Sequence, residues 1–281
     1  MIHTDDNTEI AFIGGGNMAR SLIGGLIARG AEATTIRVAE PVESLREALQ
    51  RDFGVRGFAT ATEAAAGAAV WLLAVKPQVM RGVCSELSGL ALAQQPVAIS
   101  IAAGITAGQL ARWLGGDSGS APAVVRAMPN TPALLGAGIT GLFASATVAA
   151  GQREQSERLL GAVGATVWVE DEAQMDAVTA VSGSGPAYVF LLAEAMQAAG
   201  EAQGLPADTA RALTAQTLLG AARMLVESPD APDVLRARVT SPGGTTQAAI
   251  ETFEAGGLRA LVARAVAAAT ERGRQLSAAN D

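Results

Sequence analysis

The chain has 281 residues, 49% of them hydrophobic and 17% charged, and a formal net charge of −7 at pH 7. This length and apolar content predict one large or two ordinary folded domains and exclude a disordered chain. The acidic balance excludes nucleic acid and anionic membrane surfaces as expected partners, because both require clustered positive charge.

Histidine, cysteine and lysine occur once each, as His3, Cys84 and Lys76. A zinc site needs several Cys or His ligands, and a Ser-His-Asp or Cys-His system needs a placed imidazole. We therefore expect no metal site and no catalytic system of this kind. A lone cysteine cannot form an intrachain disulfide, and the polar first residues lack the apolar core of a secretion signal, so we expect a cytoplasmic protein. The uncharged stretches 127–152 and 177–193 are interrupted by Pro and Gly, which argues against a membrane span.

From residue 9 to residue 169, short apolar runs bounded by turn residues alternate with helical spacing of apolar residues, which is typical of a doubly wound parallel sheet. The predicted strands are residues 10–13, 36–39, 70–74, 97–100, 124–127, 139–143 and 166–169. The predicted helices between them are residues 18–29, 44–53, 80–90 and 107–113.

The strand signal ends near residue 171, and the rest of the chain is predicted to be all helical. We therefore predict domains at residues 1–170 and 171–281. The helix predicted from Pro186 to Gln203 is apolar nearly all round in its first half, so one small domain would not cover it. This favours a homodimer through the second domain; the alternative is a helix buried against the first domain.

The first strand runs directly into a glycine-rich turn that opens a helix. Gly14 permits a tight turn, Gly16 lets a pyrophosphate approach the backbone, and Ala19 allows close packing of the helix on the strand. Free N–H groups at the helix start would face the phosphates. The pattern predicts a Rossmann-type α/β sheet, and the alternative is a similar turn without a ligand. The predicted cofactor-binding residues of this turn are Ile13, Gly14, Gly15, Gly16, Asn17 and Met18.

Glu40 ends the second predicted strand, where an acidic side chain would accept hydrogen bonds from the adenosine ribose. Its charge would repel the 2′-phosphate of NADPH and so favour NADH. Two alternatives stay open: Glu40 could be a solvated residue before Pro41, and Arg37 or a moved loop could still admit NADPH.

Two further segments follow predicted strands and lie at the carboxyl edge of the sheet, where open α/β folds bind ligands. The predicted cofactor-binding residues there are Ala74, Val75, Lys76, Pro77, Ala102, Ala103 and Gly104. Lys76 could instead be a surface charge.

Three unusual segments remain, at residues 128–132, 182–188 and 239–246. Together with the earlier turns they read, in order, IGGGNM, AVKP, SIAAG, MPNTP, AVSGSGPAY and VTSPGGTT. In these motifs, over essentially its whole length, the chain resembles the pyrroline-5-carboxylate reductase family. The resemblance implies NADPH- or NADH-dependent reduction of 1-pyrroline-5-carboxylate to L-proline, the last step of proline biosynthesis. It also implies an all-α C-terminal dimerisation domain, an active site where the cofactor meets helices of both subunits, and a homodimer or a ring of dimers.

The same resemblance implies that the Pro-Gly-Gly-Thr-Thr loop binds the substrate carboxylate and that Thr246 lies by the ring nitrogen. A Gly-Gly pair before a helix presents free backbone N–H groups to a carboxylate, although the threonines could serve only as caps. The predicted substrate-binding residues are Asn130, Gly243, Gly244, Thr245 and Thr246, and the predicted catalytic residues are Thr246 and Ser184. Ser184 could instead only cap a helix.

Two positions depart from the family pattern. Ala61 stands where an asparagine near the adenosine is frequent, and Gln247 stands where an aliphatic residue or Glu is frequent. The first leaves the adenosine contacts open. A histidine or lysine acid is not required, because an imine can bind already protonated and the protein mainly positions the two rings. Two alternative functions stay open. One is a β-hydroxyacid dehydrogenase-like enzyme, but that class uses a catalytic lysine in its helical domain, and residues 171–281 contain no lysine. The other is a non-catalytic nucleotide-binding regulator.

Overall fold

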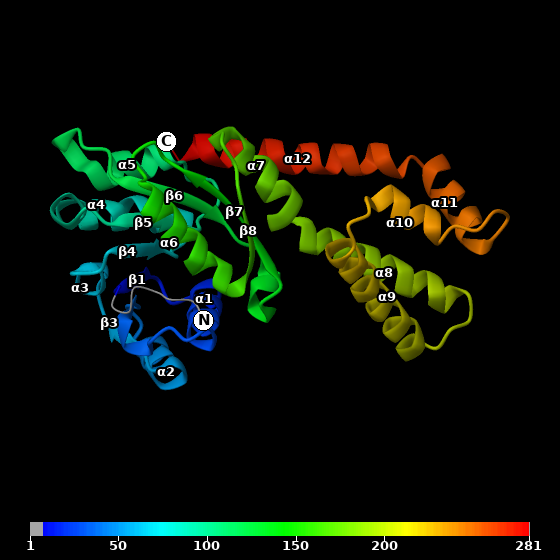
Figure 1. The fold of residues 1–281 in the computed structure, drawn as a ribbon, viewed down its shortest axis with the longest axis horizontal. Helices are drawn as coiled ribbons and strands as arrows, with labels where there is room; N and C mark the ends of the chain where they lie inside the picture. Colours follow the sequence, from blue (N-terminus) through cyan, green and yellow to red (C-terminus); the bar gives the residue numbers. More distant parts are fainter. Residues whose placement is uncertain (1–7, 281) are drawn as a thin grey trace. The chain divides into compact units, whose positions relative to one another are not determined.

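The computed structural model describes residues 8–280 of the chain. They form two compact units, one from residues 8–184 with 268–280 and one from residues 185–267 (Figure 1). His3 lies outside the described residues. These units are groups of residues that pack together, whereas the predicted domains at 1–170 and 171–281 were defined by function. The domain limits therefore stay a prediction.

The first unit is built on one sheet, whose strand order in the described chain is β3-β2-β1-β4-β5-β6-β7-β8. The strands are β1 (Ile10–Ile13), β2 (Ile36–Ala39), β3 (Arg56–Phe58), β4 (Val70–Leu73), β5 (Val97–Ser100), β6 (Ala123–Met128), β7 (Gly138–Ala144) and β8 (Gly164–Trp168). β1 pairs in parallel with β2 on one side and with β4 on the other. The winding direction therefore reverses at β1, which confirms the predicted Rossmann-type sheet.

Helices cover both faces of this sheet, because successive strand residues point to opposite faces. Phe12 belongs to the buried cluster under α1, α2 and α6, whereas Ala11 and Ile13 belong to the cluster under α3, α4 and α5. The helices of this unit are α1 (Asn17–Ala28), α2 (Glu43–Phe53), α3 (Ala61–Ala65), α4 (Pro77–Gln94), α5 (Ala107–Gly115), α6 (Ala150–Leu160) and α7 (Met175–Val178).

Four features of this unit differ from the prediction. β3, α3 and α6 were not predicted: β3 and α3 are too short to carry a periodic signal, and α6 is largely polar. β7 runs antiparallel to β6, and β8 is parallel to β7, so the sheet is mostly rather than wholly parallel. The link at residues 129–137 explains the reversal, because a parallel return would need a longer crossover.

The second unit is all helical, as predicted. Its helices are α8 (Gly185–Ala202), α9 (Ala207–Glu227), α10 (Pro232–Arg238), α11 (Thr245–Ala255) and α12 (Leu258–Ala279), the last of which continues into the first unit from residue 268. The apolar start of α8 stays open in the single chain, where Phe190 is 62% and Leu191 66% exposed. No helix within residues 8–280 is long and apolar enough to cross a membrane.

Candidate active site

The glycine turn after β1 has the geometry that a dinucleotide requires. Gly14 has φ +104°, and a Cβ there would lie 2.7 Å from the carbonyl oxygen of Ala74, so only glycine fits between β1 and the end of β4. A Cβ on Gly16 would instead meet no atom within 4 Å, which leaves room for a ligand to approach the backbone. Gly14 therefore makes the tight turn, and the approach of a pyrophosphate at Gly16 stays a prediction.

α1 begins directly behind this turn, with Gly16 as an N-cap that offers no side chain to the first N–H groups. In the part of the chain that is described, the N–H groups of Asn17 and Met18 have no acceptor, so they can bind an anion. Ala74 donates its N–H to the carbonyl oxygen of Ile13 at 2.8 Å. This brings the segment after β4 beside the glycine turn, at the switch point of the sheet.

Glu40 lies at the end of β2 beside the same turn. The residue is only 9% exposed, so it is not the solvated side chain that one alternative described. Its Oε1 accepts the N–H of Val42 at 3.1 Å, and its Oε2 lies 3.2 Å from the position that a Cβ on Gly15 would take. Arg37 is bound elsewhere: Nη1 donates to Glu9 at 2.7 Å, and Nη2 donates to the carbonyl oxygen of Glu63 at 2.7 Å.

The other predicted cofactor segments lie at the same carboxyl edge. Lys76 is exposed at the N-cap of α4 and has no ion-pair partner among the side chains that the structure describes. Ala102 is buried after β5. Gly104 has φ +71°, and its carbonyl oxygen accepts Nδ2 of Asn280 at 2.9 Å, so it also packs against the end of α12.

Asn130 binds the chain two residues before Ser184, in the first unit. Asn130 is 9% exposed; its Nδ2 donates to the carbonyl oxygen of Ser182 at 3.1 Å, and its Oδ1 accepts the N–H of Ile139 at 3.0 Å. Residues Thr179–Gly183 form a π-helix, which closes with the N–H of Ser184 donating to the carbonyl oxygen of Thr179 at 2.8 Å. π-helical turns are rare and concentrate at functional sites.

The glycine-threonine loop belongs to the second unit. Gly243 has φ +69°, and the N–H of Gly244 donates to the carbonyl oxygen of Ser241 at 3.0 Å, which closes a tight turn. The N–H of Gly243 is already bound by Oε1 of Gln247 at 2.7 Å, and Nε2 of Gln247 donates to Glu251 at 2.6 Å.

α11 begins after this turn, with Gly244 as its N-cap and no side-chain cap. Thr245 and Thr246 are therefore the first helical residues, and they do not cap α11 as the alternative proposed. Within the described residues their N–H groups have no acceptor, so these two donors, rather than that of Gly243, are open to a carboxylate.

A family model described as pyrroline-5-carboxylate reductase dimerisation matches residues 172–276, and one described as NADP oxidoreductase, coenzyme F420-dependent, matches residues 9–104. A pyrroline-5-carboxylate reductase of Pseudomonas aeruginosa is 52% identical over 269 residues, which cover 96% of this chain and 97% of the relative. The chain belongs to the pyrroline-5-carboxylate reductase family. This is a family of NAD(P)-dependent oxidoreductases.

Solved structures of pyrroline-5-carboxylate reductases have the same fold. The structure of the Coxiella burnetii protein is 44% identical, has a TM-score of 0.92, and covers 96% of this chain and 99% of its own. A Plasmodium falciparum pyrroline carboxylate reductase, solved with NADP bound, is 26% identical with a TM-score of 0.83 and covers 97% and 99%.

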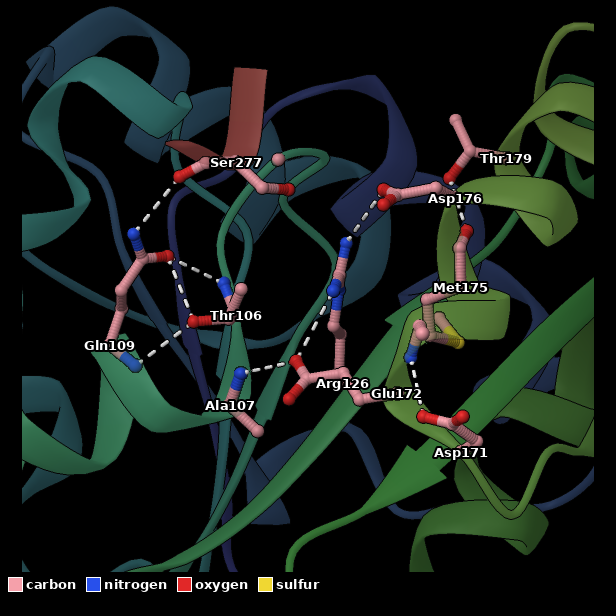
Figure 2. Close-up of polar contacts among 12 residues, drawn as sticks. Thr106, Ala107, Gln109, Arg126, Asp171, Glu172, Met175, Asp176, Thr179 and Ser277 are labelled. Carbon is pink, nitrogen blue, oxygen red and sulfur yellow. Dashed lines mark hydrogen bonds and ion pairs between the residues drawn. The ribbon is translucent and has the colours of Figure 1, made fainter. Parts of the chain in front are cut away.

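One buried polar cluster of this reductase was missed by the sequence analysis. Arg126 of β6 has a side chain only 5% exposed, which lies 3.2 Å from Oε1 of Glu172 and 3.6 Å from Oδ1 of Asp176 (Figure 2). Glu172 also accepts the N–H of Ala107 at 2.6 Å. The available signal was a single charge inside an otherwise apolar strand, because a buried charge needs a partner.

The one thiol of the reductase, on Cys84, is not suited to serve as a nucleophile. Cys84 is fully buried in α4, and burial raises its pKa to about 12. A thiol with this pKa stays protonated near neutral pH and is a poor nucleophile.

Proposed function

We propose that this protein reduces 1-pyrroline-5-carboxylate to L-proline with NAD(P)H, the last step of proline biosynthesis. The observation that carries the proposal is 52% identity to a pyrroline-5-carboxylate reductase across 96% of the chain. The glycine turn and the threonine loop, which the reaction would need for its two anionic groups, are both intact.

The residues around β1 fit a dinucleotide. Gly14 allows the close approach of the backbone to Ala74, Gly16 leaves open space, and the first N–H groups of α1 are free to bind the pyrophosphate. The bound cofactor supplies a hydride to the carbon of the C=N bond. Lys76 adds a positive charge at the same edge of the sheet, where it can pair with a cofactor phosphate.

We propose that NADH is accepted and that Glu40 opposes the 2′-phosphate of NADPH. The carboxylate is held against the glycine turn and has no ion-pair partner within residues 8–280. It is therefore oriented to accept the ribose hydroxyls and would repel an added phosphate.

The substrate carboxylate is proposed to accept the N–H groups of Thr245 and Thr246, with Gly243 and Gly244 shaping the turn. Thr246 is also proposed to accept the N–H of the protonated ring nitrogen through its hydroxyl. The nitrogen keeps that proton when the neighbouring carbon receives the hydride, so the residues need not transfer one. Ser184 is proposed to contact the substrate from the loop before α8.

The protein is further proposed to act as a homodimer, or a ring of dimers, through residues 171–281. The exposed apolar start of α8 and the dimerisation model matched over residues 172–276 support this. The proposed domains are a dinucleotide-binding domain at residues 1–170 and a substrate domain at 171–281. The cytoplasm is the proposed location, because the only cysteine is buried and reduced.

The direct test mixes purified protein with 1-pyrroline-5-carboxylate and NADH or NADPH, then follows the loss of reduced-nicotinamide absorbance and the formation of proline. Thr246→Ala is expected to lower kcat/KM by about tenfold or more while the Kd for NAD(P)H stays almost unchanged. Wild-type protein that forms no proline with either cofactor would refute the proposed function. Normal kcat/KM in Thr246→Ala would remove only the role of Thr246.

A further inference from the structure

Three alternate residues form a row along β6 and its continuation: Arg126 and Met128 lie in β6, and Asn130 lies two residues beyond its end. The residue between the last two is Pro129, and Asn130 has the extended φ of −127° and ψ of 166°, so the row keeps the two-residue spacing of a strand. We call these three residues the β6 row. Each of them contacts the segment formed by α7 and the π-helix.

One of the three contacts lies near the start of that segment, and the other two lie together at its end. Arg126 binds Asp176 at 3.6 Å near its start (Figure 2). The Cε of Met128 lies 2.7 Å from the position of a Cβ on Gly183, so the Met128 side chain packs closely on this glycine. Asn130 then binds the carbonyl oxygen of Ser182, at the end of the π-helix.

Asn130 is unusual because its side chain does not serve the helix that it begins. It is the N-cap of the 3-10 helix Thr131–Leu135 but makes no side-chain cap, although asparagine is a favoured capping residue. Both ends of its amide are instead used on other segments, at the carbonyl of Ser182 and at the N–H of Ile139. A buried amide with both groups occupied is held in one orientation.

We propose that Asn130 is a positioning residue: it fixes the last turn of the π-helix and thereby the position of Ser184, rather than binding the substrate itself. The N–H of Ser184 is bonded to Thr179 inside the same turn, so a shift of the Ser182 carbonyl is passed directly to Ser184. This inference rests on the proposed function, in which Ser184 contacts the substrate.

The test is Asn130→Asp in the full-length protein. The aspartate keeps an acceptor for the N–H of Ile139 but places an oxygen instead of a donor against the carbonyl of Ser182. Gln94→Glu is a matched control: the Gln94 amide also bridges a backbone N–H, at Gly67, and a backbone carbonyl, at Ala65, away from this segment.

Asn130→Asp is expected to lower kcat by about tenfold to a hundredfold, because small displacements of a reacting group have effects of this size. Gln94→Glu is expected to change kcat by less than about twofold. In a Ser184→Ala background, Asn130→Asp should lower kcat by less than about twofold further, because residues that act as a unit are not additive. Asn130→Ser, which adds no charge, repeats the test if Asn130→Asp does not fold.

Three results would overturn the positioning role: a lower melting temperature with unchanged kcat, a raised KM with unchanged kcat, or full additivity with Ser184→Ala. Amide hydrogen exchange gives a readout that does not depend on activity. Exchange at residues 179–184 should be faster in Asn130→Asp than in Gln94→Glu, and equal exchange would also overturn the proposal. An inactive wild-type protein, in contrast, would refute the proposed function and leave the exchange result to decide the role of Asn130.

Discussion

Glu40→Gln should shift cofactor preference toward NADPH. The Glu40 carboxylate is nearly buried, and its Oε1 is held by the N–H of Val42. Among the described side chains it forms no ion pair, and Nη1 of Arg46 donates to the backbone carbonyl oxygen of Glu40 at 2.8 Å. Glutamine keeps the shape and the acceptor for Val42 but removes the negative charge. The substitution therefore isolates the electrostatic part of the discrimination.

The size of the shift follows from the distance at which a 2′-phosphate would meet the carboxylate. Two unit charges about 4 Å apart repel by about 1 kcal/mol in water and about 4 kcal/mol at an effective dielectric constant of about 20. Because about 1.4 kcal/mol is a factor of ten, these limits correspond to about fivefold and about 700-fold in NADPH affinity. NADH should bind slightly less tightly, because a neutral amide is a weaker acceptor for the ribose hydroxyls than a carboxylate.

The assay compares kcat/KM for NADH and NADPH in the wild-type protein, Glu40→Gln and Glu43→Gln. Glu43 is the control because it is an exposed glutamate at the start of α2, with the same charge. The NADPH/NADH ratio should rise in Glu40→Gln alone. An unchanged ratio, or an equal rise in both variants, would refute a direct contact between Glu40 and the cofactor.

Three further changes test other parts of the structure. Gly141→Ala should destabilise the protein by about 2 kcal/mol, because its Cβ would lie 2.3 Å from Cγ1 of Val178; in urea unfolding, adding Val178→Ala should recover part of this, and no recovery would contradict the clash. Hydrogen bonding to its arginine partners holds the pKa of Glu9 below 4.5, so its stabilisation is present above about pH 4.5 and is lost as the pH falls through the lowered pKa. Glu9→Gln should therefore unfold at lower urea than the wild type at about pH 7, and this difference should shrink as the pH falls through the lowered pKa of Glu9; a difference that stays constant down to acid pH would count against the linkage. Gln247→Leu removes the side-chain bond that holds the Gly243 turn, and it should therefore raise the substrate KM by about threefold to tenfold with an unchanged NADH Kd. A lower KM would mean that the Gln247 amide competes with the substrate for the N–H of Gly243.

Backbone-determined parts of the site could be predicted from the sequence. Gly14 has a positive φ, which glycine adopts readily, and a glycine-rich turn between a strand and a helix can be recognised in the sequence. Glu40 was found in the same way, because its distance along the chain from the glycine turn places it at the end of the neighbouring strand.

Contacts between distant segments could not be predicted in this way. The sequence marks Asn130 as unusual, but nothing local says that its amide reaches Ser182, more than fifty positions later. The bond between Gly243 and Gln247 is local, but it was missed as well, because the Gln247 side chain occupies the N–H that a Gly-Gly pair is expected to leave free. Side-chain bonds of this kind depend on packing, which a local pattern does not encode.

The antiparallel pair β6–β7, the largest departure from the predicted sheet, is also what positions the segment before Ser184. Met128 of β6 lies opposite Gly141 of β7 in this pair. Gly183 packs against Met128, and Val178 packs against Gly141, so the two ends of the π-helical segment rest on two paired residues. A parallel β7 would need a crossover on one face of the sheet and would not return directly beside Met128. The short reversal at residues 129–137 therefore creates both the surface that receives this segment and the turn that carries Asn130 to it.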